Sequence, residues 1–593
     1  MKDEFSGSFD LERLFDHGNP QSKADGMQLN AAVHAEAGDI DCVFVGMPEL
    51  AGAGNSHGVG GIAQAQALIH AWRLHGVELP AKLRGTYALA IVDRAQKRIL
   101  LAVDRFAVRT VCYRLDRQSF SFSERADTVA GRSLSLNPQA VFDYLYFHAI
   151  PAPRTIFSDV LRLPAGHSLI VDTQGAKLVR HWTPQFDERR YRDFDGAKEQ
   201  LRSLIRKAVA DAASGQHKTG AFLSGGTDSS TVAGMLCSVT GQSAPAYSIG
   251  FEAEGYDEME YARLSARHFG CDHHEYYVTP DDLIRSIPAI AQHYDQPFGN
   301  SSALPAYYCA KMAREDGCTL LLAGDGGDEL FGGNSRYAVQ KFLQYYQSVP
   351  QGIRRIIEPF CTDDSFLRRI PGLRQATGYV RHSRDPLPHR LQKMNLLMQL
   401  GPGNIFTSAL LSKMEPGAPG RHMQATWDSC EADSVVNRML AYDWRYTLAD
   451  SDLPKVRGAT DMAGIAVSYP LLADDLVDFS MGLPRDWKLK GFRLRWFFKE
   501  ALRGFLPDAV ISKKKQGFGL PHGQWMTRHP RLLAIARDSL HGLAGRGVVN
   551  AGFVGDLLDR RLQEHPPYYG EMIWILMALE QWLRGQPGVT LDC

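Results

Sequence analysis

The sequence has no paired-cysteine motif, no long apolar run and no excess of charge. Its nine cysteines are scattered over 593 residues without a CxxC pair, so the ligand spacing of a structural zinc site is missing. No apolar stretch approaches the roughly 20 residues that span a bilayer, and the polar start MKDEFSGSFD is unlike a signal peptide. Lys plus Arg equals Asp plus Glu at 66 each, so no net charge attracts nucleic acid. We expect a cytoplasmic protein with free cysteines and with neither nucleic acid nor membrane as a partner.

Length and periodicity predict two domains. The chain exceeds the size at which one hydrophobic core stops growing. A charged stretch near residues 181–200 leads into helical spacing at residues 201–213, so we predict a first domain at residues 1–190 and a second at residues 191–593. Short apolar or alternating runs predict strands in the first domain at residues 42–47, 87–93, 98–104, 110–115, 119–123 and 167–172.

Strands and helices alternate at the start of the second domain. Residues 220–223 and 244–251 have the pattern of strands, and residues 229–239 and 259–269 have the spacing of helices. This alternation predicts an α/β domain with a parallel, doubly wound sheet. After about residue 340 the pattern is mostly helical, interrupted by proline- and glycine-rich stretches at residues 400–404 and 415–420.

A loop of glycine and serine, LSGGTDSS at Leu223–Ser230, lies between the first predicted strand and helix of the second domain. Glycine allows a tight turn, and the free N–H groups at a helix start bind phosphates. Asp228 is placed to hold the Mg²⁺ of a nucleotide. A plain turn remains the alternative, because the string lacks the Walker pattern GxxxxGK[ST]. The residues expected to bind pyrophosphate are Ser224, Gly225, Gly226, Ser229 and Ser230.

A second loop of glycine and acidic residues, LLLAGDGGDELFGG at Leu320–Gly333, follows an apolar run about a hundred residues later. In an open parallel sheet both loops would lie at the carboxyl ends of their strands, where ligands bind. We expect Asp328 to be a second carboxylate for Mg²⁺, and Asp325 to act as a base or to orient a reacting group. A solvated acidic turn is the alternative, which the presence of both loops in this order disfavours.

These motifs resemble those of the asparagine synthetase B family, whose loops read SGGxDSS and SGxGxDE. The resemblance extends to LRGTYALAIVDRAQKRILLAVDRFAVRTVCYR at residues 83–114 and TIFSDVLRLPAGHSLIVD at residues 155–172. It also covers LKGFRLRWFFKEALRGFLPDAVISKKKQGFG at residues 489–519. It implies a β-rich, Ntn-hydrolase-like (glutaminase-like) α+β domain, followed by a PP-loop ATP pyrophosphatase synthetase domain with a helical C-terminal part.

The resemblance also implies roles for single residues. The loop from Leu223 to Ser230, together with Gly324, would bind ATP, and Ile249 and Gly250 would lie against adenine. Asp228 and Asp328 would hold Mg²⁺. Lys515 matches the family lysine that neutralises the phosphoryl and acyl intermediates, although a solvated run of charge at residues 513–515 is the alternative.

The first half departs from the glutamine-dependent members of the family. Such a member begins with a mature cysteine whose thiolate attacks glutamine. This sequence starts Met1-Lys2-Asp3, and its first cysteine is Cys42, inside a predicted strand. The HRGPD and SDxE segments of the family are missing, and GGIAQ at residues 60–64 stands near the place of the latter. We therefore expect a degenerate glutamine amidotransferase-like domain that makes no ammonia.

The second half departs from the family where it would bind a small amino acid. The family segment ExRxPFLD is replaced by AVSYPLLAD, which puts Ala466, Ser468 and Ala473 in place of its Glu, Arg and Asp. Serine cannot make the bidentate contact of arginine with a carboxylate. Free aspartate is therefore not the expected substrate, and the adenylation site needs a different acid and amine.

Members of the family without glutaminase chemistry include β-lactam synthetases and the macrolactam-forming cyclases of lasso peptides. The former carry Tyr where this chain has Asp325, which favours the cyclase. The expected reaction activates an Asp or Glu side chain of a precursor core peptide as its adenylate and joins it to the peptide's N-terminal amine. An α-amino group has a pKa near 8, so a modest base such as Asp325 suffices beside Lys515. A leader-peptide protease is the expected partner.

Several other interpretations stay open. An ammonia- or glutamine-dependent asparagine synthetase, or a small-molecule amide ligase like β-lactam synthetase, would share every nucleotide-binding residue. A tRNA-thiolating enzyme is disfavoured by the balanced charge and the lack of CxxC. An inactive peptide-binding scaffold is disfavoured by the retention of Asp228, Asp328 and Lys515.

Two further groups of residues have more than one interpretation. Tyr307, Tyr308 and Tyr337 could line a peptide pocket or pack in a core. The run His273-His274-Glu275 could bind metal, but it lacks the remaining features of a zinc site.

Overall fold

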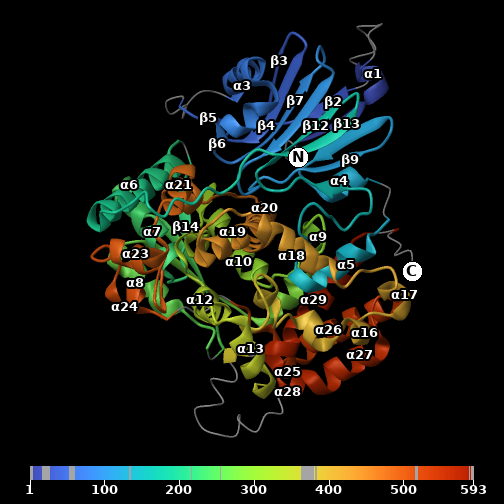
Figure 1. Cartoon of the computed structure of the whole chain (residues 1–593), viewed down its shortest axis with the longest axis vertical. Helices are drawn as coiled ribbons and strands as arrows, with labels where there is room; N and C mark the ends of the chain where they lie inside the picture. The colour runs from blue at the N-terminus through green and yellow to red at the C-terminus, as the bar shows by residue number, and fades with distance from the viewer. Residues whose placement is uncertain are drawn as a thin grey trace.

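The computed structural model describes residues 5–15, 27–52, 61–131, 135–215, 217–253, 255–361, 379–380, 383–514, 519–586 and 588. Strands dominate the described residues up to Arg180, and a mixed region of helices and strands follows (Figure 1). None of the helices described is both long and apolar enough to cross a membrane.

The N-terminal region is a sandwich of two antiparallel sheets. Phe9 and Phe122 of one sheet and Val92 and Leu101 of the other belong to the apolar core between them. The first sheet has the order β11 (Leu161–Arg162), β9 (Cys112–Leu115), β10 (Ser119–Ser123), β1 (Ser6–Asp10) and β2 (Met27–Asn30). The second has the order β13 (Gly175–Arg180), β12 (His167–Asp172), β8 (Arg98–Val103), β7 (Tyr87–Asp93), β4 (Ile40–Gly46) and β3 (Val33–Ala37).

Helix α3 (Gly61–His75) covers the outer face of the second sheet. Its Trp72 is buried against the sheet and donates a hydrogen bond from Nε1 to Asp93 Oδ2 at 2.8 Å. The strands thus follow the predicted alternation, with one face on each of two cores. Short elements complete the region: α1 (Leu11–Phe15), α4 (Ala126–Ala130) and the pair β5 (Glu49–Leu50) and β6 (Leu83–Arg84).

The second region is built on a five-stranded parallel sheet. Its order is β16 (Asp272–Val278), β15 (Pro245–Phe251), β14 (Thr219–Phe222), β17 (Leu320–Leu322) and β18 (Ala466–Ser468). The order reverses between β14 and β17, which is the place where the loops of an open sheet separate and ligands bind. Helices α6 (Phe194–Ala213), α7 (Thr227–Thr240) and α8 (Met259–Phe269) share one core with the sheet, and α10 (Ala303–Glu315) belongs to the other. This confirms the predicted doubly wound α/β fold.

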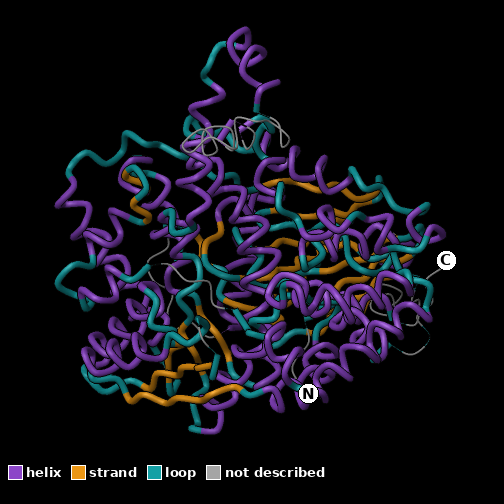
Figure 2. Tube along the Cα trace, turned by 90° about the horizontal axis from the view of Figure 1, so that it is seen from below, coloured by secondary structure: helices purple, strands orange, loops and turns teal. Residues whose placement is uncertain are grey.

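The chain after the first two parallel crossovers is mostly helical. Helices also make up much of the whole trace, as Figure 2 shows. A π-helical segment, η5 (Trp444–Asp452), joins α19 (Val435–Asp443) to α20 (Leu453–Ala463). The other α-helices that the structure describes after β16 are α9 (Pro280–His293), α11 (Gly327–Phe331), α12 (Ser335–Gln347), α13 (Gln351–Ile357), α15 (Leu396–Leu400), α16 (Pro402–Ile405), α17 (Ser408–Leu411), α18 (Ala418–Asp428), α21 (Asp474–Met481), α22 (Arg485–Lys488), α23 (Trp496–Ala501), α24 (Asp508–Ser512), α25 (His522–Arg528), α26 (Pro530–Gly545), α27 (Ala551–Asp556), α28 (Leu562–Glu564) and α29 (Pro566–Arg584).

The two regions are joined by charged and apolar contacts. Arg84 Nη1 lies 2.8 Å from Asp475 Oδ1, and Arg105 Nε lies 2.8 Å from Asp474 Oδ1. Helix α5 (Pro138–Phe147) packs in the same core as α29, and its Tyr144 donates a hydrogen bond to the carbonyl of Ile575 at 2.8 Å. The boundary near residue 190 stays a prediction.

Candidate active site

The first glycine loop turns directly from β14 into α7. The helix begins at Thr227, two residues before the predicted start, so Asp228 lies in its first turn. Ser224 Oγ and Ser229 Oγ are 2.9 Å apart, and the Ser224 N–H donates a hydrogen bond to Ser229 Oγ at 3.1 Å. Gly225 has a φ of +70°, and a Cβ there would lie 2.7 Å from the Tyr261 carbonyl carbon. Only glycine therefore lets the loop pack against α8.

The second glycine loop touches the first. A Cβ on Gly324 would lie 2.7 Å from Ser229 N and 2.9 Å from the carbonyl carbon of Asp228. The loop continues into α11, whose first turn carries Asp328. The carboxyl ends of β14 and β17 are thus in backbone contact, which brings both sets of side chains to one place.

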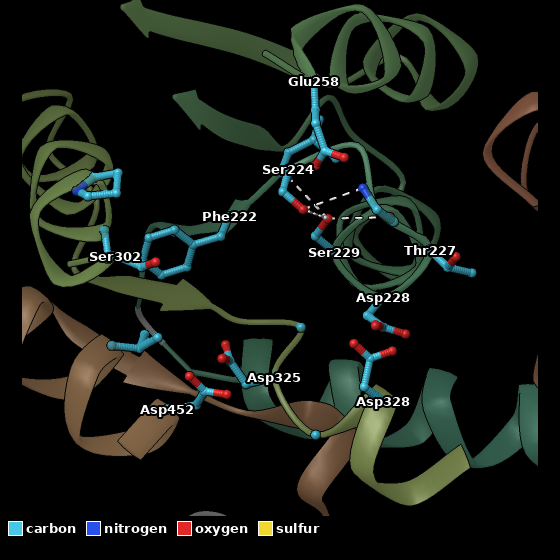
Figure 3. Close-up of a pocket in the computed structure, with 18 of the residues that line it drawn as sticks. Phe222, Ser224, Thr227, Asp228, Ser229, Glu258, Ser302, Asp325, Asp328 and Asp452 are labelled. Carbon is cyan, nitrogen blue, oxygen red and sulfur yellow. Dashed lines mark hydrogen bonds between the residues drawn. The ribbon is translucent and has the colours of Figure 1, made fainter. Parts of the chain in front are cut away.

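A pocket of about 430 Å³ lies between the two loops. Figure 3 shows Ser224 and Ser229 at one side, and the carboxylates of Asp228 and Asp328 turned toward one another. The free N–H groups at the start of α7 make this side suitable for a phosphate chain. From the predicted set, the lining includes Leu223, Ser224, Gly226, Asp228, Ser229, Ile249, Gly324, Asp325 and Asp328.

A buried arginine bridges the two carboxylates expected to hold a metal. Arg495 Nη1 lies 2.5 Å from Asp228 Oδ2 and 2.9 Å from Asp328 Oδ1. Its side chain is only 6% exposed, and its φ of +51° is uncommon for a residue other than glycine. The carboxylates therefore lie close enough to share one cation. Carboxylate oxygens are the protein ligands that Mg²⁺ prefers, so the pair fits this ion.

An acid and base cluster lies on the opposite wall of the pocket. Lys455 Nζ is 2.8 Å from Asp452 Oδ1 and 3.8 Å from Asp325 Oδ1. Burial raises the pKa of Asp325 to about 6, against the opposing charge of Lys455. Figure 3 shows Asp325 and Asp452 facing one another across this wall. Asp325 is therefore a carboxylate that gains and loses a proton near neutral pH.

Three of the predicted site residues do not line the pocket. Ser230 is fully buried and its Oγ lies 2.9 Å from Ser265 Oγ on α8. Gly250 belongs to the opposite face of β15, where a Cβ would meet the Tyr277 ring. Gly225 contributes to the shape of the loop and not to its open surface. Lys515 lies outside the described residues.

Other pocket residues were not predicted. Arg495 and Lys455 are among them, and so is Lys513, whose Nζ lies 2.8 Å from Glu258 Oε1. The Lys513 side chain is only 8% exposed, so this member of the 513–515 run is not a solvated surface charge. The sequence pattern around these basic residues gives little sign of a site, because isolated Arg and Lys residues are common on helices.

The tyrosines and histidines singled out in the sequence lie elsewhere. Tyr308 stacks on Tyr276 at 5.2 Å between ring centroids, and Tyr337 is buried and bonded to Asp443. Tyr307 packs against the same core as Tyr308. None of these three tyrosines lines the pocket.

The histidines of β16 have protein partners. His273 Nε2 lies 2.7 Å from Ser248 Oγ, and His274 Nδ1 lies 3.1 Å from Asp316 Oδ2. Over the part of the chain that the structure describes, no three His, Cys, Asp or Glu side chains are grouped to hold a metal ion.

The cysteines of the first region are poor nucleophiles. Cys42 lies in β4 and Cys112 in β9, and both side chains are fully buried. Burial raises the pKa of each thiol, which disfavours the reactive thiolate. Neither thiol fits the attack on an amide substrate.

Comparisons with known proteins give two matching families. The family model of asparagine synthase matches residues 200–584, and that of a glutamine amidotransferase domain matches residues 55–182. Asparagine synthetase 1 (glutamine-hydrolyzing) of Bacillus subtilis is 23% identical over 478 residues, covering 78% of this chain and 72% of that protein. A putative glutamine-hydrolyzing asparagine synthetase of Mycobacterium bovis is 24% identical over 559 residues, covering 87% and 79%.

Among solved structures, glutamine phosphoribosylpyrophosphate amidotransferase from B. subtilis, complexed with ADP and GMP, matches at 13% identity. The match covers 54% of this chain and 75% of that one, with a TM-score of 0.19. So small an overlap carries no argument about the site.

Proposed function

Since this chain belongs to the asparagine synthase family, we propose that it closes a peptide macrolactam with ATP. ATP-dependent formation of an amide bond is the activity of the family, and this chain is a ligase of that kind. The observation that carries the proposal is the contact between the two glycine loops, which places Asp228 and Asp328 together beside a phosphate-binding helix start. The part of the proposal that goes beyond the family is the identity of the acid and the amine, which we take to belong to one peptide.

The proposed reaction has two steps. The turn from Ser224 to Ser229 binds the phosphates of ATP while a substrate carboxylate attacks the α-phosphorus and pyrophosphate leaves. The amine then attacks the acyl carbon, the bond to the AMP oxygen breaks, and Asp325 accepts the proton. Asp228 and Asp328 would hold Mg²⁺, which when bound neutralises phosphate charge. Lys515 is proposed to stabilise the oxyanion. Binding both reacting ends in one site supplies the effective molarity that ring closure needs.

We choose a peptide as the substrate because of the residues that stand where the family binds a free amino acid. Ser468 ends β18 beside β17, where the family has Arg, and Ala473 precedes α21. Neither side chain provides a cation for a free α-carboxylate. A precursor core peptide supplies acid and amine in one molecule, and a leader-peptide protease that exposes the amine is the proposed partner.

A small-molecule amide ligase, including an asparagine synthetase, is the second candidate. The names of the relatives favour it. The two candidates share the nucleotide pocket and differ in the acceptor. Two assays with ATP and Mg²⁺ distinguish the candidate functions. One offers aspartate with ammonium, and the other offers linear peptides with an internal Asp or Glu. Cyclisation predicts AMP, pyrophosphate and a peptide lighter by one water; formation of asparagine would overturn the macrolactam proposal.

The Asp325–Lys455 pair predicts the acid limb of the pH profile. A base must be unprotonated, so we expect amide formation to slow as the pH falls through about 6, the pKa of Asp325. Lys455 lowers this pKa by its charge. The substitution Lys455→Met should therefore raise the pKa and move the acid limb to higher pH. The measurement is single-turnover amide formation against pH; an unmoved limb in Lys455→Met would show that Asp325 is not the titrating group.

Replacement of Lys515 tests the proposed oxyanion contact. We expect Lys515→Ala to slow amide formation by about 10²-fold, the effect of removing one charge-stabilising donor. Circular dichroism should show an unchanged fold. Lys177→Ala, on the exposed strand β13, is the matched control and should keep the parent rate. AMP and amide formed at the parent rate by Lys515→Ala would contradict the assigned role.

A further inference from the structure

A second cavity, of about 530 Å³, lies next to the nucleotide pocket. It is bordered by the end of α5, by the segment η5 and by the start of α29. Nothing in the proposed nucleotide chemistry uses it. Its size is within the range of sites for organic ligands and far exceeds the space that ammonia occupies.

The π-helical segment η5 borders both cavities. Asp450 and Ser451 line the second cavity, whereas Asp452, the next residue, lines the nucleotide pocket. Asn300, also on the nucleotide pocket, donates a hydrogen bond from Nδ2 to Ser451 Oγ at 3.3 Å. Ser451 on the second cavity and Asp452 of the acid and base cluster are therefore consecutive residues.

One wall of the second cavity is aromatic. Phe147 stacks on Tyr446, with ring centroids 5.2 Å apart and an interplanar angle of 11°. Tyr442 lies against Tyr446 at 4.6 Å. This wall suits a flat or apolar side chain, because aromatic rings pack well by offset stacking and edge contacts.

The carboxylates of the cavity differ in their partners. Asp443 is bonded to Arg336, and Asp450 Oδ1 lies 2.8 Å from Arg162. Glu571 has histidine partners instead: His522 Nε2 at 3.2 Å and His148 Nδ1 at 3.6 Å. Among the ion pairs of the described residues, Glu571 has no arginine or lysine.

Glu571 is ionised near neutral pH, so its carboxylate can bind a cation. Burial opposes ionisation, but the hydrogen bond and charge of His522 hold the pKa of Glu571 below its usual range. Burial also lowers the pKa of His148, so this imidazole is neutral near pH 7. An ammonium group entering from the cavity would therefore meet an ionised carboxylate.

We propose that the second cavity binds the amine substrate, an organic primary amine carried next to an aromatic or apolar group. Glu571 holds its ammonium group, and Phe147, Tyr442 and Tyr446 hold the apolar neighbour. This assignment rests on the proposed function of the nucleotide pocket. The ammonium first loses one proton to solvent. Its nitrogen then bonds to the acyl carbon as the bond to the AMP oxygen breaks. One of its two remaining protons passes to Asp325, and the other stays as the N–H of the amide.

Binding of phenylalaninamide to the full chain tests the assignment. This probe carries a primary amine beside a ring, whereas N-acetylphenylalaninamide keeps the ring and lacks the cation. We expect the parent protein to bind the first at least about tenfold more tightly, because a hydrogen bond to a charged group is involved. In Glu571→Gln this preference should disappear. Glu564→Gln, exposed on α28, is the matched control.

The variant Tyr446→Leu and the ligand ATP provide two independent checks of the assignment. Tyr446→Leu should weaken both ring-bearing probes by a similar factor, which reports on the aromatic wall independently of Glu571. Equal affinity of both probes for the parent protein, or an unchanged preference in Glu571→Gln, would overturn the assignment. ATP binding is measured in parallel: a parent protein that binds the amine but no ATP would overturn the proposed function and leave the amine site standing.

Discussion

Replacing Asp228 by alanine is expected to lower ATP–pyrophosphate exchange by about 10²–10³-fold, the scale of losing one group that stabilises the reacting charge, which Asp228 would do by holding Mg²⁺. Asp228 lies in the first turn of α7, at the phosphate side of the pocket, and faces Asp328. Without it, the cation that neutralises the leaving pyrophosphate would keep a single carboxylate. The measurement is exchange of labelled pyrophosphate into ATP at saturating Mg²⁺.

The same substitution disturbs a buried ion pair, so a second variant is needed to separate the two effects. Arg495 would keep Asp328 but lose the contact with Asp228 Oδ2 at 2.5 Å. Breaking a buried pair costs about 3–5 kcal/mol when it leaves the charge alone, and the remaining carboxylate makes the loss smaller here. The double variant Asp228→Ala with Arg495→Met removes the stranded cation. We expect it to regain thermal stability without regaining exchange. Recovery of exchange would mean that Asp228 is needed only to neutralise the buried charge of Arg495, and not to hold a metal ion.

The parallel sheet and its two loops could be predicted because their signals are local. Strand, glycine turn and helix follow one another within about a dozen residues at both loops. The reversal of strand order between β14 and β17 then follows from ordinary α/β topology. These elements carry most of the predicted site, which explains why Asp228, Asp325 and Asp328 reach one pocket.

Periodicity explains why Ser230 and Gly250 do not line the pocket. Helix α7 begins at Thr227, so Ser229 and Ser230 are separated by about 100° around its axis. Only the first of them can face the pocket, and Ser230 turns toward α8. Likewise, neighbouring side chains of a strand point to opposite faces. Ile249 therefore faces the pocket and Gly250 cannot.

The basic residues of the site could not be found from local patterns. Arg495 meets Asp228 across 267 positions of sequence, and Lys455 comes from a helix that packs on α10. Such contacts depend on how distant helices dock. One signal was available: Arg495 lies in the segment that resembles the family near the C-terminus, although its role could not be deduced from one sequence.

Gly324→Ala is expected to lower kcat/KM for ATP in the exchange reaction by about 10³-fold. The added methyl would lie 2.7 Å from Ser229 N and 3.0 Å from Ser229 Cα, with backbone on every near side. The two loops must therefore separate, which moves both the phosphate turn and the carboxylate of Asp228. A shift of about 1 Å in a reacting group alone can cost 10²-fold, and here two groups move together.

The expected loss of activity in Gly324→Ala comes from a steric clash and not from a backbone angle that alanine cannot adopt. The control is therefore a glycine whose Cβ would meet no neighbour. Gly324 is not among the glycines with positive φ, so alanine could adopt its backbone angles. Gly555→Ala is the matched substitution, because a Cβ at this helical position in α27 meets nothing within 4 Å. It should leave exchange unchanged and stabilise the helix by about 0.5–1 kcal/mol. If Gly324→Ala keeps the parent kcat/KM with an unchanged melting temperature, the two loops need not touch for ATP to bind, and the geometry assigned to the pocket is wrong.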